Sequence, residues 1–187
     1  MENTLDIQEY SPIIKSQIWH YEIGNTHGFW FSSTGKPRVV IGPHWMYCLI
    51  SVLLFTIIFG TLLLFSSYFV PRIMSTISWV AYCTCLTSWL ISGLKNPGLE
   101  LEILTNQQEI TKYFNDKKFC RVCEVLREPG TLHCVECDVC IKEKQSHSLI
   151  VGKCIGKEIK VPYYILIGSI IFLASYIGFI AVYAIFI

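Results

Sequence analysis

The chain alternates between long runs of apolar residues and segments rich in polar and charged side chains. Three apolar runs reach the length that crosses a bilayer, which takes about 20 helical residues: residues 45–70, 73–94 and 161–187. The first run has no charged residue, and the second is rich in the small residues that let helices pack closely in a membrane bundle. The pattern therefore predicts three transmembrane helices, with Pro71 and Arg72 in the turn between the first two.

Composition favours a membrane protein over a soluble one. Of the 187 residues, 52% are hydrophobic and 16% are charged, and the mean hydropathy is +0.47. Soluble domains carry about 25% charged residues. The net charge of +1 gives no reason to expect a nucleic-acid partner. The first partner that the pattern predicts is the lipid bilayer itself.

The positions of lysine and arginine give the expected orientation. Three precede the first apolar run, one lies at Arg72, and eleven lie between residues 95 and 160. Loops on the cytoplasmic side of a membrane carry an excess of these residues. We therefore expect the N-terminus and the middle segment to face the cytosol, or the matrix in a mitochondrion, and the C-terminus to face the opposite side.

The runs divide the chain into segments with different expected roles. We expect an N-terminal cytosolic or interfacial segment at 1–44, a transmembrane hairpin at 45–94, a linker at 95–119, a cysteine-rich module at 120–160 and a third transmembrane helix at 161–187.

The N-terminal segment carries a group of aromatic residues, Trp19, Phe29, Trp30 and Phe31. They are either a belt along the lipid headgroups or the apolar side of a small domain that packs on the middle segment. The start of the chain lacks the basic and then apolar pattern of a cleavable signal. We therefore expect the nine cysteines to be reduced thiols and not disulfides.

Metal-binding residue types are concentrated in the module. Eight of them follow the pattern C-x2-C-x9-H-C-x2-C-x2-C-x6-H-x6-C: Cys120, Cys123, His133, Cys134, Cys137, Cys140, His147 and Cys154. Eight thiolate and imidazole ligands are the number that two closed tetrahedral zinc sites need, whereas iron–sulfur clusters more usually take thiolates alone. The sequence therefore predicts two structural Zn²⁺ ions. The other cysteines, Cys48, Cys83 and Cys85, fall in the apolar runs, where we interpret them as small packing residues.

This spacing resembles the cysteine-rich domain of the DHHC protein S-acyltransferases. That domain has CxxC, HC and CxxC motifs, then Asp-His-His-Cys and a later Cys-Ile-Gly. This chain reads Cys120-Arg-Val-Cys123, His133-Cys134, Cys137-Asp-Val-Cys140, Gln145-Ser146-His147-Ser148 and Cys154-Ile155-Gly156. Asn96-Pro97-Gly98 is similar to the family's Asp-Pro-Gly turn. The resemblance covers the chain from about Gly24 to the third apolar run.

The resemblance implies a ligand set and a fold class. Zinc sites interleave in the family, which by position implies two groups: Cys120, Cys123, His133 and Cys140 around one zinc, and Cys134, Cys137, His147 and Cys154 around the other. The expected fold is an α-helical integral membrane protein with three transmembrane helices and a small two-zinc cysteine-rich module between the second and third. The family encloses an acyl chain among four spans, so with three we expect less room for a lipid tail.

The resemblance also implies a reaction for which this chain lacks the side chains. In the family, the tetrad cysteine accepts a fatty acyl group from acyl-CoA and passes it to a substrate cysteine, the first histidine acts as general base, and the aspartate orients that histidine. Ser148, Ser146 and Gln145 hold these three positions here, whereas His147, the zinc-binding position, is unchanged. Loss of a general base alone costs about 10²- to 10⁴-fold in rate. We therefore expect no catalytic residues and interpret the chain as a pseudoenzyme.

Three functions follow from this interpretation. The leading hypothesis is a non-catalytic accessory or structural subunit of a larger membrane protein complex, with the zinc module as interaction platform. The alternative is an atypical or partner-dependent protein S-acyltransferase, and the third is a binder of lipid or acyl-CoA without turnover. By family, we expect a Golgi or ER membrane, with the mitochondrial inner membrane as the alternative.

Basic residues surround the module, and two readings of them stay open. They either contact anionic headgroups or acyl-CoA phosphates, or they form a solvated face. The residues are Lys117, Lys118, Arg121, Lys142, Lys144, Lys153, Lys157 and Lys160.

Overall fold

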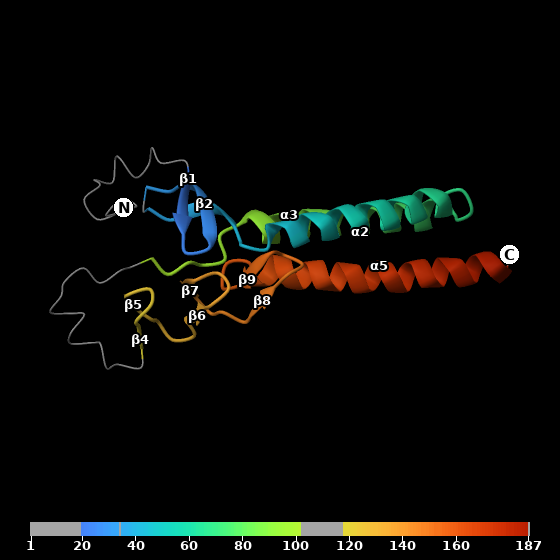
Figure 1. Ribbon diagram of the computed structural model, residues 1–187. Helices are drawn as coiled ribbons and strands as arrows, with labels where there is room; N and C mark the ends of the chain where they lie inside the picture. Colours follow the sequence, from blue (N-terminus) through green and yellow to red (C-terminus); the bar gives the residue numbers. More distant parts are fainter. Residues whose placement is uncertain (1–19, 34, 102–117, 187) are drawn as a thin grey trace.

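The structure is a computed structural model that describes residues 20–33, 35–101 and 118–186. Three long helices extend side by side in one direction from an end built of short strands, and the C-terminus lies at the far end of the helices (Figure 1). Each helix is long and apolar enough to cross a membrane. The predicted fold class, three spanning helices with a cysteine-rich module between the second and third, is confirmed.

In the described part of the chain, the spanning helices are α2 (Trp45–Ser66), α3 (Arg72–Leu94) and α5 (Lys160–Phe186). α3 packs against both α2 and α5. The first helix is shorter than predicted, because it ends at Ser66 and residues 67–70 form the turn before Pro71. A proline disfavours the helical conformation of the residue that precedes it, which explains why the apolar run outlasts the helix.

Aromatic side chains fill the space between α2 and α3. Phe55 stacks on Tyr82 at 5.9 Å between ring centroids and meets Trp89 edge-on at 5.4 Å. The indole N–H of Trp89 donates a hydrogen bond of 3.0 Å to the carbonyl of Ile150 in the module. The helix bundle and the module are therefore joined by a partly buried hydrogen bond as well as by packing.

The three cysteines of the helices have different surroundings. Cys85 is buried in the helix core, and Cys48 is partly buried against it. Cys83 is exposed on α3, so the prediction that it packs inside the chain is wrong. A helix in a three-helix bundle keeps one face toward lipid, and Cys83 lies outside the buried positions of α3.

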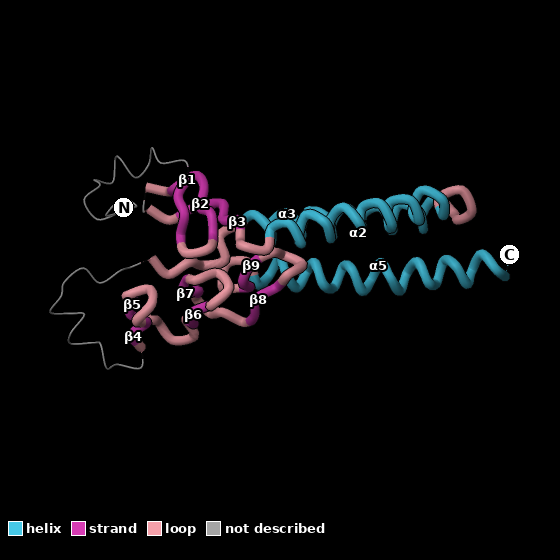
Figure 2. Tube along the Cα trace, in the orientation of Figure 1, coloured by secondary structure: helices cyan, strands magenta, loops and turns pink. Residues whose placement is uncertain are grey.

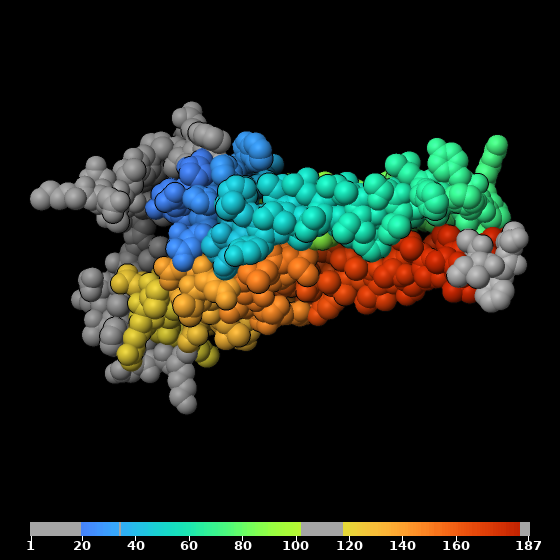
Figure 3. Space-filling view, turned by 45° about the vertical axis from the view of Figure 1, so that its right-hand side comes forward, coloured from blue at the N-terminus to red at the C-terminus, as the bar shows by residue number. Residues whose placement is uncertain are grey.

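Residues 20–41 form a three-stranded antiparallel sheet, which the apolar pattern did not predict. Its strands β1 (His20–Ile23), β2 (Thr26–Phe31) and β3 (Pro37–Ile41) follow one another in space. Figure 3 shows this blue sheet resting against the orange module.

The sheet contacts the module at its first turn. The backbone N–H of Asn25 donates to the carbonyl of Cys137 at 2.9 Å. Gly24 has a φ of 55°, and a Cβ there would collide with the Asp138 carbonyl, so the close approach requires glycine. The sheet therefore packs on the middle segment through Gly24 and Asn25, and the surface that the aromatic residues meet stays a prediction. Trp30 is 62% exposed, and Trp19 lies outside the described residues.

Residues 95–101, predicted as part of a linker, are packed into the strand-rich end. Leu99 forms a β-bridge with Ile141, and both side chains are buried. The side-chain oxygen of Asn96 accepts hydrogen bonds from the backbone N–H groups of Gly98 and Leu99 at 2.8 and 3.0 Å. This turn can be buried because these backbone N–H groups have hydrogen-bond partners. The rest of the predicted linker, residues 102–117, lies outside the described residues.

The module itself consists of three short hairpins, visible as paired magenta strands in Figure 2. They are β4 (Phe119–Cys120) with β5 (Val125–Leu126), β6 (Leu132–Cys134) with β7 (Val139–Ile141), and β8 (Ser146–Ser148) with β9 (Lys153–Ile155). Two-stranded hairpins are marginal alone. Half of the buried residues in the two clusters around them are cysteines and few are large apolar side chains, so this core needs a further cross-link.

Candidate metal centres

The hairpins place ligand-type side chains at directly paired positions. His133 pairs with Cys140 across β6–β7, and His147 pairs with Cys154 across β8–β9. Opposite residues of an antiparallel pair have Cβ atoms about 4.5–5.5 Å apart. Each pair is therefore close enough for both side chains to reach one ion.

Strand alternation lets one hairpin serve two sites. Neighbouring residues His133 and Cys134 of β6 point to opposite faces of the strand. The structure accordingly gathers two separate groups, in each of which the ligand atoms lie within 4.8 Å of one another: Cys120, Cys123, His133 and Cys140, and Cys134, Cys137, His147 and Cys154. These are the groups that the family resemblance implies. All eight residues are brought together, and each group could bind a metal ion.

The second group has the shape of a tetrahedral site. Nδ1 of His147 is 3.7 Å from Sγ of Cys134 and 3.3 Å from Sγ of Cys137. It is 3.6 Å from Sγ of Cys154, which lies 3.6 Å from Sγ of Cys137. Ligand atoms held tetrahedrally at zinc–ligand distances of about 2.0–2.3 Å would be about 3.6–3.8 Å apart. The donor set and its spacing therefore fit one zinc-sized ion.

In the first group, Nδ1 of His133 lies 3.2 Å from Sγ of Cys123. Hydrogen bonds between thiols shift the pKa values in both groups. The thiol of Cys140 lowers the pKa of Cys123 to about 6, and the thiol of Cys154 lowers the pKa of Cys137 to about 6. The same hydrogen bonds raise the pKa of Cys140 and Cys154. A lowered pKa favours the thiolate of Cys123 and of Cys137, and the thiolate is the form that binds metal.

The outer nitrogen of each ligand-type histidine faces an acid. Nε2 of His147 is 3.0 Å from Oε2 of Glu136, and Nε2 of His133 is 3.6 Å from Oδ1 of Asp138. Because Nδ1 faces the thiols, the proton of a neutral imidazole belongs on Nε2, the nitrogen that lies beside the carboxylate. Such an arrangement fixes the tautomer and the ring orientation of a metal ligand.

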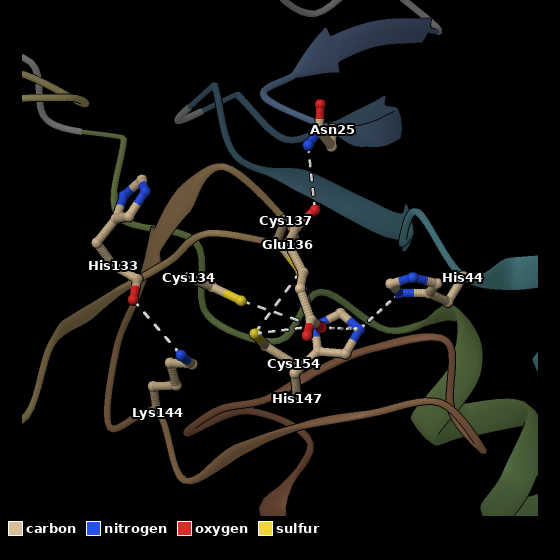
Figure 4. Close-up of polar contacts among 9 residues, drawn as sticks. All are labelled: Asn25, His44, His133, Cys134, Glu136, Cys137, Lys144, His147 and Cys154. Atoms are coloured by element: carbon tan, nitrogen blue, oxygen red, sulfur yellow. Dashed lines mark hydrogen bonds and ion pairs between the residues drawn. The ribbon is translucent and has the colours of Figure 1, made fainter.

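A second histidine also reaches His147. Nδ1 of His44 lies 2.9 Å from Nε2 of His147 (Figure 4). His44, Glu136 and His147 form a further group with metal-ligating atoms. Because His147 already turns Nδ1 to the thiols, we interpret this group as the outer layer of the second site. The sequence carries no local signal for His44, which is 103 residues from His147.

In the described part of the chain, none of Gln145, Ser146 and Ser148 is hydrogen-bonded to a carboxylate or an imidazole. Ser148 is 9% exposed, and in the described part of the chain its hydroxyl has no hydrogen bond to an imidazole or a carboxylate. Ser146 is exposed. The side-chain oxygen of Gln145 accepts a hydrogen bond of 2.8 Å from the hydroxyl of Tyr164 on α5. Gln145 therefore ties the module to the helix and does not orient a histidine.

Lys153, one of the predicted surface cations, is buried, so that prediction is wrong for this residue. Its side chain is 1% exposed, and Nζ donates to the carbonyls of Val40, Gly93 and Lys95 at 2.7 Å each. Two of these carbonyls belong to the end of α3, where the helix leaves acceptors free. Burial lowers the pKa of Lys153 to about 7, yet three acceptors are the number that an ammonium group can satisfy. Lys117 lies outside the described residues.

Comparison with known proteins gives one family. Residues 113–187 match the family model described as DHHC palmitoyltransferase. Over 86 residues, the chain is 34% identical to Palmitoyltransferase ZDHHC18-B of Danio rerio and 33% identical to Palmitoyltransferase ZDHHC18 of Homo sapiens. These aligned residues make up 46% of this chain and 21% of each relative. It is 32% identical over 85 residues to Palmitoyltransferase ZDHHC14 of Mus musculus, which is 46% of this chain and 16% of that protein. The matched part thus spans about a fifth or less of these curated relatives.

Proposed function

Residues 113–187 of this chain form a domain of the DHHC palmitoyltransferase family, and from that premise we propose a non-catalytic role for the chain. It acts as an accessory subunit of a larger membrane protein complex, with the two-zinc module as its interaction platform. The observation that carries this proposal is at His147. Its Nδ1 faces the thiols, and its Nε2 is engaged by Glu136 and His44, so this imidazole has no nitrogen free to accept a proton from the neighbouring Ser148.

The residues at the tetrad positions support the same conclusion. A serine hydroxyl is a poor nucleophile without a general base, and the position of the base holds Ser146, which cannot accept its proton at neutral pH. Gln145, at the position of the orienting aspartate, is held by Tyr164. All eight ligand positions are kept, while all three positions of the acyl-transfer chemistry differ. Selection for the fold without the reaction would leave this pattern.

We propose that the two ions are Zn²⁺ and that their role is structural. The four-coordinate Cys₃His sets are closed, with no ligand position left for a substrate. When bound, the ions cross-link the three hairpins, and structural zinc sites contribute folding free energy directly. A module without a large apolar core is then rigid enough to present a surface.

Two exposed apolar side chains of the module suit a contact with a partner protein. Val135 is 83% exposed in the loop between Cys134 and Cys137, and Val122 is 65% exposed in the loop between Cys120 and Cys123. Both loops are held at each end by ligand-type cysteines, so their conformation would be fixed when zinc is bound. Rigid loops with apolar tips lose little entropy when they dock.

We place the module on the cytosolic side, or on the matrix side in a mitochondrion, because lysines and arginines are concentrated there. Family resemblance favours a Golgi or ER membrane, and the mitochondrial inner membrane is the alternative. We treat residues 120–160 as the module and the sheet at 20–41 as a part that packs on it.

Purification of the tagged chain from native membranes in mild detergent tests the accessory role. We expect it to elute with a partner in fixed stoichiometry, well above its own 21.5 kDa. Val122→Asp with Val135→Asp should release the partner and keep the metal content. A chain that elutes alone from its native membrane would contradict the proposal.

A second candidate function is protein S-acylation of an atypical or partner-dependent kind. The observation in its favour is the family domain itself, since the relatives that match are named palmitoyltransferases. This activity would require Ser148 to carry the acyl group as an oxygen ester. Acyl labelling separates the two candidates.

A further inference from the structure

A cleft of about 610 Å³ lies where the N-terminal sheet, the segment after α3 and the module meet. Its volume falls within the roughly 300–1,000 Å³ of small-ligand sites. Five cationic side chains line it: Lys36, Arg38, Lys95, Lys142 and Lys157. Gln145, Ser146 and Ser148 are not among its lining residues. The cleft therefore gathers lysine and arginine side chains and does not use the tetrad positions.

Lys142 is the fixed charge of this cleft. Its Nζ lies 3.0 Å from the carboxylate of the buried Glu100 and 3.1 Å from that of Glu128. Desolvation lowers the pKa of Lys142, but the two carboxylates outweigh it and raise the pKa above its ordinary value. Lys142 is accordingly a charged and positioned lysine at neutral pH.

Two of the cations have no carboxylate partner. Lys95 lies 3.5 Å from the carboxylate of Glu158, which also lines the cleft. In contrast, Lys36 and Arg38 are exposed, and in the described ranges neither forms an ion pair. Lys157 is also paired, at 3.4 Å from the carboxylate of Glu143. Among the described residues, the unpaired charges of the lining are therefore those of Lys36 and Arg38, and they are the ones left over for a ligand.

The cleft lies at the level where two spanning helices leave the apolar region. Lys95 directly follows α3, and Glu158 lies two residues before the start of α5 at Lys160. Figure 1 shows these helix ends at the strand-rich end of the molecule. A lipid headgroup of the adjoining membrane surface is therefore within reach, and so is a soluble anion.

The lining also narrows the chemistry of the ligand. Among the described residues that line the cleft, none is aromatic and Leu99 is the one large apolar side chain, so this part of the lining offers no ring to stack on a nucleobase. Lysines and an arginine are the side chains that bind phosphate oxygens, the arginine with two parallel hydrogen bonds. We propose that this cleft binds a phosphorylated polyol headgroup, with the exposed Lys36 and Arg38 and the ion-paired Lys142 as its contacts. The headgroup belongs either to an anionic phospholipid or to a soluble phosphate ester. This goes beyond the accessory role and holds whether or not the chain transfers acyl groups.

The test uses the full chain in phosphatidylcholine nanodiscs at physiological ionic strength. One arm titrates soluble inositol trisphosphate by calorimetry, with inorganic phosphate as the comparison. The other arm replaces part of the phosphatidylcholine by phosphatidylinositol bisphosphate and counts retained lipid by native mass spectrometry. Lys36→Gln with Arg38→Gln removes the two unpaired charges. Lys118→Gln with Arg121→Gln, one exposed lysine and one exposed arginine of the module, is the matched control.

We expect at least one inositol probe to bind, and the cleft pair of substitutions to weaken it about tenfold or more through lost charge-assisted contacts. The control pair should change affinity by less than about twofold, since screening at this ionic strength removes distant charges. Zinc content and thermal unfolding should be the same in both variants, which shows that the fold is intact. Binding of the soluble probe identifies the free ester as a ligand, and binding of the lipid alone identifies the headgroup. Equal losses in both variants, or binding of neither probe, would overturn the proposal.

Discussion

Nδ1 of His44 lies 2.9 Å from Nε2 of His147, so the residue before the first spanning helix reaches the back of a ligand-type imidazole in the module. Glu136 approaches the same nitrogen at 3.0 Å. The second metal group is thereby held from two sides, by its own hairpins and by the start of α2. A change at the start of α2 therefore alters the geometry of the metal group, and a change in the metal group alters the position of the helix.

Replacement of His44 should weaken metal binding at the second group. His44→Ala removes a partner that orients His147, and loss of such a partner typically costs about 10- to 100-fold in metal affinity. Because Glu136 remains, we expect the lower end, about tenfold. Competition with a zinc chelator measures the loss, and His27→Ala in the N-terminal sheet is the control. Equal zinc retention in both variants would show that His44 does not position His147.

Each ligand-type cysteine should be needed for one ion. Cys123→Ser should lower the zinc content from about two ions to about one, because a hydroxyl does not replace a thiolate ligand. Cys83→Ser, on the exposed face of α3, should leave the content unchanged. Metal analysis of the purified chain measures both. If Cys123→Ser retains the full content, the first group is not a zinc site.

Lys153 should matter for stability and not for lipid binding. Lys153→Met keeps the volume but leaves the carbonyls of Val40, Gly93 and Lys95 without their shared donor. Buried groups without partners cost about 1–3 kcal/mol each, and relief of lysine desolvation offsets part of this. We expect the free energy of unfolding to fall by about 3 kcal/mol.

The exposed Lys157→Met provides the comparison in thermal unfolding, with an expected change of about 0.5 kcal/mol or less. If the two variants unfold alike, the buried ammonium does not stabilise the junction of the sheet, α3 and the module.

The parts of the structure that follow local rules could be predicted from the sequence. Helix length and apolarity in a bilayer depend on composition, which is why α2, α3 and α5 were expected within a few residues of their ends. The grouping of the eight ligand-type residues was implied by the family spacing. Strand alternation at His133 and Cys134 gives the physical reason for it.

The parts that were missed depend on contacts between distant segments. The sheet at residues 20–41 has short strands with a mixed burial pattern, and it is fixed by Gly24 and Asn25 against the module. The sequence does not distinguish a buried lysine from an exposed one. Lys153 is buried because its ammonium group donates to three carbonyls that belong to other segments. His44 likewise becomes a partner of His147 through the fold alone.

Acyl labelling of the wild-type chain, purified in the presence of zinc, tests the central claim most directly. A restored tetrad, Gln145→Asp with Ser146→His and Ser148→Cys, is run beside it, and Ser148→Ala is the blank. We predict no acyl label on the wild-type chain, and a metal content of about two zinc ions that is the same in all three proteins. A hydroxylamine-resistant acyl label on the wild-type chain that disappears in Ser148→Ala would contradict the claim, because Ser148 would then be a working nucleophile.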